Sequence, residues 1–78
     1  MVTIQNISVS GNTITCDLYP ESEQTPLRAV INATQKPYMI TNRENLPSKF
    51  RAYYYHAVNA LERYSIEKLP SSIKEMWY

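Results

Sequence analysis

Cysteine and histidine are the side chains best suited to nucleophilic catalysis, and this chain has one of each, Cys16 and His56. Cys16 stands two residues from both Ile14 and Leu18, so an extended chain directs all three side chains to one apolar face. A thiol in apolar surroundings stays protonated and unreactive. His56 falls on the polar side of a helical pattern. The spacing therefore predicts a buried cysteine and a surface histidine, which do not form a catalytic pair.

The other chemical groups also argue against an enzyme. No two of the seven Asp and Glu residues share a face of a predicted helix at a spacing of three or four residues. One cysteine and one histidine are too few for a Cys/His zinc site. Gly11, the only glycine, cannot form a glycine-rich phosphate loop. We therefore expect a non-catalytic protein that needs no cofactor and no metal.

Tyrosine is the conspicuous residue, with seven copies and a run of three at residues 53–55. Because a helix turns by about 100° per residue, one apolar face cannot bury all three. Tyr54 falls on that face, whereas Tyr55 lies between Arg51 and Asn59, one turn before and one turn after it. Tyrosine is enriched in protein interfaces. The pattern predicts a partner-binding surface of Arg51, Tyr55 and Asn59, although an ordinary surface tyrosine over an arginine stem would give the same pattern.

The same stretch offers an alternative, a surface for single-stranded nucleic acid. Cations for phosphates and an aromatic ring for a base are what such a ligand requires. The chain's pI of 7.8 lies below the value of about 9 that is usual for nucleic-acid-binding domains. This second hypothesis is therefore less favoured than a protein partner. Its residues are Lys49, Arg51, Tyr55, His56 and Arg63.

A β-hairpin is predicted at the N-terminus. Apolar residues nearly alternate over residues 2–9, and their phase slips at Asn6, as it does in a strand with a bulge. Residues 10–12 contain the glycine and an asparagine, the residue types that a tight turn prefers. Residues 13–19 alternate again, with one apolar and one polar face. No charge or proline protects residues 2–9, so we expect them to form an open sheet edge.

Two more strands and two helices are expected after the hairpin. The alternation predicts a third strand over residues 27–34 and a short fourth over residues 38–41. The period then changes to 3.6 and predicts a long helix over residues 48–64. A capping-box pattern at residues 72–75 predicts a short second helix that includes Met76 and Trp77. The predicted fold is α+β, with an antiparallel sheet of three to four strands covered on one face by both helices.

Length and charge set the remaining expectations. Residues 1–78 form one small domain, and a chain this short buries only about 60% of its surface, so a partner or a second copy would add stability. Neither a signal peptide nor a membrane-spanning run is visible, and the lone cysteine suits a reducing compartment, so we expect a cytoplasmic protein. All eight Lys and Arg residues follow residue 25, whereas three of the seven acids precede it. Such polarity can steer an acidic partner toward the C-terminal half or let two copies meet head to tail, although ordinary solvated faces of mixed sign are the favoured interpretation.

Overall fold

The computed structural model describes residues 1–76, and its first two strands form the predicted hairpin. β1 (Val2–Ser10) pairs antiparallel with β2 (Thr13–Pro20), and Gly11 in the turn has a φ of +60°. The predicted bulge is confirmed, because the register shifts between Gln5 and Ser8. Asn6 there adopts a φ of +54°, a backbone conformation that asparagine tolerates better than most residues.

Two further strands continue the sheet beside β2. β3 (Leu27–Asn32) pairs with β2, and the two-residue β4 (Met39–Ile40) pairs with the end of β3. The fourth strand is therefore present but shorter than residues 38–41. Beyond it, Asn42 takes over the pairing: its side chain accepts a hydrogen bond from Val30 N at 3.0 Å and donates one to Arg28 O at 2.8 Å.

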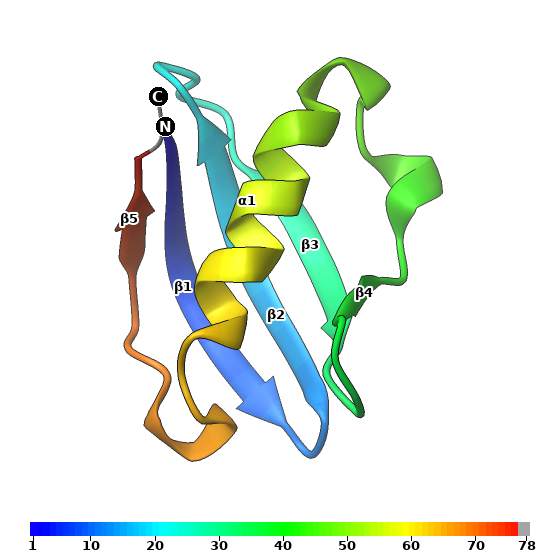
Figure 1. Ribbon diagram of the computed structural model, residues 1–78. Coiled ribbons are helices and arrows are strands. Elements are labelled where there is room, and N and C mark those ends of the chain that lie inside the picture. The colour runs from blue at the N-terminus through cyan, green and yellow to red at the C-terminus, as the bar shows by residue number, and fades with distance from the viewer. Residues whose placement is uncertain (77–78) are drawn as a thin grey trace.

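The predicted long helix is confirmed, with an irregular first turn. A 3₁₀ turn, η2 (Ser48–Phe50), leads directly into α1 (Arg51–Glu62). Proline is tolerated just before a helix, and Pro47 occupies that place. α1 crosses one face of the sheet (Figure 1). Its buried residues are Tyr54, Ala57, Ala60 and Leu61.

The predicted second helix is wrong, because the segment is a strand. A 3₁₀ turn, η3 (Ile66–Lys68), is followed by β5 (Ile73–Glu75), which pairs antiparallel with Val2–Ile4. An isolated helix of two turns is unstable, whereas a strand here satisfies the backbone groups on the outer side of β1. The sheet order is therefore β4-β3-β2-β1-β5. The predicted open edge at β1 is wrong for Val2–Ile4, which β5 covers, and Trp77 lies outside the described residues.

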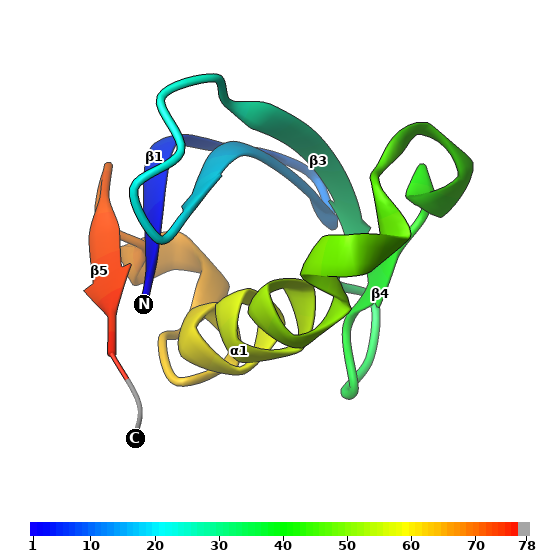
Figure 2. The same ribbon diagram turned by 90° about the horizontal axis from the view of Figure 1, so that it is seen from above.

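The core lies between α1 and the concave face of the sheet. The sheet curves around the helix, so that β5 and β4 lie on opposite sides of α1 (Figure 2). Val2, Ile4, Ile14, Leu18 and Leu61 are fully buried. None of the helices formed by residues 1–76 has the length and apolarity needed to cross a membrane.

Candidate interaction groove

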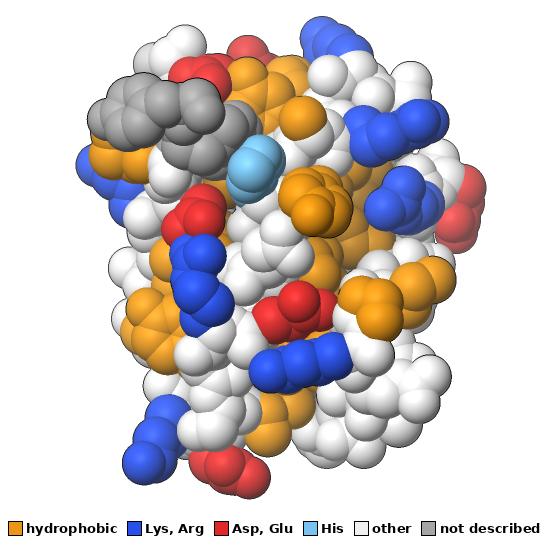
Figure 3. Space-filling model, in the orientation of Figure 1, with side chains coloured by type: hydrophobic (Ala, Val, Ile, Leu, Met, Phe, Trp, Pro, Cys, Tyr) orange, Lys and Arg blue, Asp and Glu red, His pale blue; other side chains and the backbone are white. Residues whose placement is uncertain are grey.

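A groove opens on one side of α1 because the helix does not lie centrally on the sheet. The backbone of α1 approaches β1 and β5 most closely and stays farther from β3 and β4. Residues 37–48, which include β4 and the 3₁₀ turn η1 (Arg43–Asn45), form a separate wall beside the helix. The molecular surface is hollowed between this wall and α1 (Figure 3).

Two adjoining hollows make up this groove, which we call the α1–β4 groove. The central hollow has a volume of about 170 Å³ and lies between residues 37–40 and the helix residues Tyr55, Val58, Asn59 and Glu62. The end hollow, of about 140 Å³, lies near the start of α1. Both are lined by Arg43 and Tyr54, so they adjoin. Pockets for small-molecule ligands usually exceed about 300 Å³, so each hollow suits a single side chain better than a cofactor.

Apolar side chains form the floor and both walls of the central hollow. Ile40 and Tyr54 lie in the floor and are 7% and 3% exposed. Met39 on one wall and Tyr55 on the other are each 64% exposed, more than any other large apolar side chain among residues 1–76. Large apolar side chains in such exposed positions mark interaction sites when they lie together.

Hydrogen bonds join the two walls at both ends of the groove. At the N-terminal end of α1, the hydroxyl of Tyr54 donates to Pro47 O at 2.5 Å. At the other end, Glu62 Oε2 accepts from Tyr38 N at 2.6 Å, and Glu62 O accepts from Lys36 Nζ at 2.9 Å. These contacts fix the wall to the helix without filling the space between them. The groove is therefore formed before any ligand arrives.

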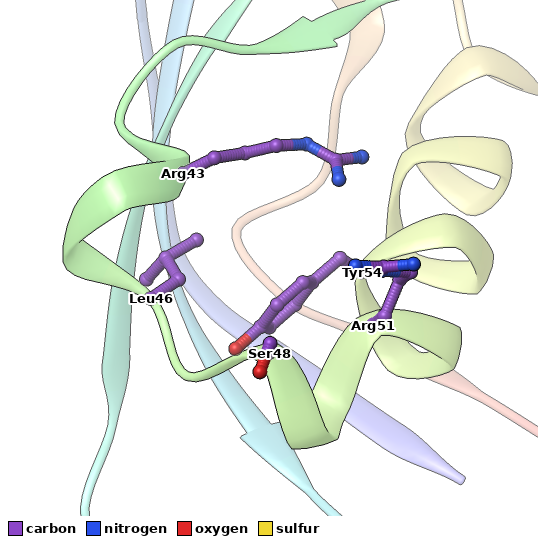
Figure 4. Close-up of a pocket in the computed structure, with 5 residues that line it drawn as sticks. All are labelled: Arg43, Leu46, Ser48, Arg51 and Tyr54. Carbon is purple, nitrogen blue, oxygen red and sulfur yellow. The ribbon is translucent and has the colours of Figure 1, made fainter.

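Opposite charges lie at the two ends of the groove. Arg43 and Arg51 line the end hollow, together with Leu46, Ser48 and Tyr54 (Figure 4). Glu62 lies at the far end, where one of its oxygens is already engaged by the Tyr38 amide. Burial raises the pKa of the Tyr54 phenol, and nearby Arg43 opposes that shift, so Tyr54 stays neutral at physiological pH.

All three residues of the predicted partner surface line the groove. Tyr55 and Asn59 lie in the central hollow and Arg51 in the end hollow. The arrangement differs from the expected one in a single respect. The three residues form one wall of a groove rather than a free-standing convex patch, because the second wall comes from residues 37–48.

The structure divides the residues of the nucleic-acid alternative between two faces of the helix. Arg51 and Tyr55 line the groove. His56, half-buried, packs edge-on against the Tyr55 ring at 5.5 Å, and Lys49 lies over the Phe50 ring at 5.1 Å. Arg63 forms an ion pair with Glu75 of β5, on the opposite side of α1 from β4. Arg63 therefore lies apart from the groove residues Arg51 and Tyr55.

The groove residues that were not anticipated from the sequence include Tyr38, Met39 and Arg43, which belong to its second wall. A short strand was predicted over residues 38–41, and a strand directs the Met39 side chain to the face opposite Tyr38 and Ile40. A large apolar residue in that outward position was the available signal. No local pattern shows that this short strand lies across from Tyr55.

Cys16, the residue best suited to act as a nucleophile, does not line the groove. Cys16 is fully buried in β2, and burial raises the pKa of its thiol to about 12, so the thiolate that a nucleophile requires is suppressed. Within residues 1–76, no cluster of three or more His, Cys, Asp and Glu side chains is placed to hold a metal ion.

Asp17 and Arg28 instead form a polar network on the sheet surface. Asp17 accepts hydrogen bonds from Asn6 Nδ2 at 2.8 Å and Arg28 Nη1 at 3.0 Å. These contacts, led by the Asn6 bond, lower the pKa of the Asp17 carboxyl. This carboxylate is therefore a fixed anion that links the bulge of β1 to β2 and β3.

Comparisons with known proteins leave the function to be argued from this geometry. No protein-family model, curated protein sequence or solved structure matches the chain.

Proposed function

We propose that the protein is a non-catalytic interaction module that binds a segment of a partner protein in the α1–β4 groove. The observation that carries the proposal is the pair Met39 and Tyr55, which line the central hollow from its two walls and are each 64% exposed. Covering them would remove apolar surface from water, which is the main driving force of protein association.

The chemistry of the two side chains suits this role. Tyrosine offers a large rigid contact area with few rotamers to restrict, and methionine adapts its shape to different partners. The hydrogen bonds at Pro47 and Tyr38 hold the walls in place, so little ordering is required on binding. Each hollow has room for about one side chain, which favours an extended peptide segment over a folded surface.

The proposal can be tested with peptides selected from a displayed library of short random sequences. We expect the selected peptides to shift the amide NMR resonances of residues 38–43 and 54–59. The double variant Met39→Ala/Tyr55→Ala should weaken binding by about tenfold or more, as loss of central apolar contacts usually does. The matched control is Val9→Ala/Met76→Ala, which shortens two other exposed apolar side chains and should leave affinity within about twofold.

Three results would redirect or overturn the proposal. Peptides that shift only residues outside the groove would contradict it. Groove resonances that move on stepwise dilution of the protein alone would identify a second copy of the chain as the partner, and the module would then be a homodimer. A single-stranded oligonucleotide that shifts Lys49, His56 and Arg63 in a salt-dependent manner would replace the proposal with the nucleic-acid alternative.

A further inference from the structure

The end hollow of the groove brings together two guanidinium groups. Arg43 extends from η1 toward the helix, and Arg51 extends from the first turn of α1, with the ring of Tyr54 between their attachment points (Figure 4). The Ser48 hydroxyl lines the same hollow. Guanidinium groups and hydroxyls are hydrogen-bond donors whose geometry matches the two oxygens of a carboxylate.

Neither guanidinium forms an ion pair with another of the residues that the structure describes. The ion pairs within residues 1–76 join Met1 to Glu21, Arg28 to Asp17 and Arg63 to Glu75, and none includes Arg43 or Arg51. The first turn of α1 contains no acidic residue, and the residue that precedes the helix provides no side-chain cap. Positive charge at the N-terminal end of a helix is unfavourable. An anion in the hollow would therefore relieve the repulsion between Arg43 and Arg51 and the repulsion between Arg51 and the positive end of the helix dipole.

The backbone on both sides of the hollow is held in place. Asn42, which precedes Arg43, is fixed to β3 by its hydrogen bonds with Val30 N and Arg28 O. Leu46 N donates to Arg43 O at 3.0 Å and closes the 3₁₀ turn. Tyr54 is nearly fully buried and bonded to Pro47 O. The two arginines therefore project from positions that do not need to rearrange around a ligand.

The distribution of charge along the groove favours a ligand with a single anionic group over a nucleic-acid strand with many phosphates. The basic end hollow is followed by the apolar central hollow and then by Glu62. A nucleic-acid strand that followed this path would bring phosphates against apolar side chains and a carboxylate, both of which oppose it. A peptide with one acidic residue near an apolar residue would match each part of the groove.

On this basis we infer that the partner segment is acidic, with an Asp or Glu carboxylate held between Arg43 and Arg51 and an apolar side chain held between Met39 and Tyr55. The inference rests on the proposed function, since it names the partner class for the same groove. The carboxylate is the anion that an unmodified protein segment carries, and its planar pair of oxygens accepts bonds from a guanidinium in a two-point manner.

The test uses the peptides selected from the displayed library and measures how often they contain acidic residues. We expect enrichment of Asp and Glu beside an apolar residue. The double variant Arg43→Gln/Arg51→Gln should bind such a peptide about tenfold or more weakly, and a peptide whose acid is replaced by its amide should lose a similar amount against the unaltered protein. The altered peptide should bind the double variant only slightly more weakly than either change alone would cause. Such non-additivity would show that the peptide acid and the two arginines contact each other.

A matched control separates this local contact from general attraction by positive charge. Lys68→Gln/Lys74→Gln removes two exposed cations elsewhere and changes the net charge equally, so its effect on affinity should stay within about twofold. If both double variants weaken binding equally, the charge acts at long range and the assigned contact is overturned.

Other outcomes distinguish failure of this inference from failure of the proposed function. Peptides that map to the groove without acidic residues, and that bind the Arg43→Gln/Arg51→Gln variant unchanged, would overturn the acidic partner and leave the interaction module intact. A phosphoserine peptide that binds when its glutamate counterpart does not would overturn the assignment to a carboxylate. If no peptide maps to the groove, the proposed function itself fails.

Discussion

The two long sides of α1 are joined to the rest of the molecule in different ways. On the β5 side, partly buried apolar residues of the 63–75 segment, among them Ile66, Leu69 and Ile73, pack against the core and close the space beneath the helix. On the β4 side, Tyr38, Ile40 and Leu46 also contribute to or contact the core, and hydrogen bonds through Tyr54 and Glu62 join the wall to the helix at the two ends of the groove. Apolar packing leaves no space between α1 and the β5 side. Hydrogen bonds at the two ends of the β4 side leave the space between them open.

The largest expected effect comes from the core that both sides share. Leu61→Ala should lower the free energy of unfolding by about 2 to 5 kcal/mol, because it leaves a cavity beneath a fully buried side chain. Val58→Ala, on the groove side of the same helix, should cost clearly less. Urea denaturation of both variants measures the difference. Equal losses would mean that the groove is packed as tightly as the core, which would remove the contrast between the two sides.

The next effect tests the hydrogen bonds that hold the β4 side. Glu62→Ala leaves the partly buried Tyr38 amide without its acceptor, so we expect a loss of about 1 to 3 kcal/mol. Hydrogen exchange should accelerate at the Tyr38 amide and remain unchanged at Ile73 in β5. Glu67→Ala, an exposed acid in η3, is the matched control and should alter neither amide. An unchanged rate at Tyr38 would show that the wall is held by something other than Glu62.

A smaller effect is expected from the polar contact on the β5 side. Arg63→Gln breaks the ion pair with Glu75, but the Arg63 side chain is 58% exposed and solvent screens the pair, so the loss should stay below about 1 kcal/mol. Added salt should reduce the difference between variant and parent. A loss larger than that of Glu62→Ala would reverse the comparison and make the β5 side the one held by polar contacts.

The smallest effect has the opposite sign. Arg51→Gln removes a cation from the first turn of α1, where the helix dipole disfavours positive charge, and should raise stability by about 0.3 kcal/mol at low salt. Arg63→Gln makes the same change at the other end of the helix, where positive charge is favoured, and serves as the control. A loss of stability in Arg51→Gln would indicate that this arginine has a structural role that the groove does not explain.

The hairpin and the helix could be predicted because their signals are local. The phase slip at Asn6, the turn at Gly11 and the period of residues 48–64 each depend on neighbouring residues alone. β5 could not be predicted in this way, because Ile73–Glu75 is a strand only through its pairing with Val2–Ile4 at the other end of the chain. Ser72 and Glu75 match the start of a helix. The segment forms a strand instead because β1 has unpaired backbone groups with which it can pair.

The candidate groove shows the same division between local and distant signals. The helical period placed Arg51, Tyr55 and Asn59 on one face, and all three line the groove. Met39 and Arg43 come from a segment whose position depends on hydrogen bonds from Asn42 to β3 and from Tyr38 to Glu62. Neither bond leaves a pattern in the sequence, so the second wall could not be foreseen.

The side chain of Asn42 also covers part of a sheet edge. β4 covers only the end of β3, and Thr41 N donates to Val30 O just beyond it, so Val30 N and Arg28 O would otherwise face solvent as an open edge. Unpaired edges of this kind recruit strands from other chains and can propagate into fibrils. Asn42 occupies these two groups through its amide, so another strand that paired here would have to displace it.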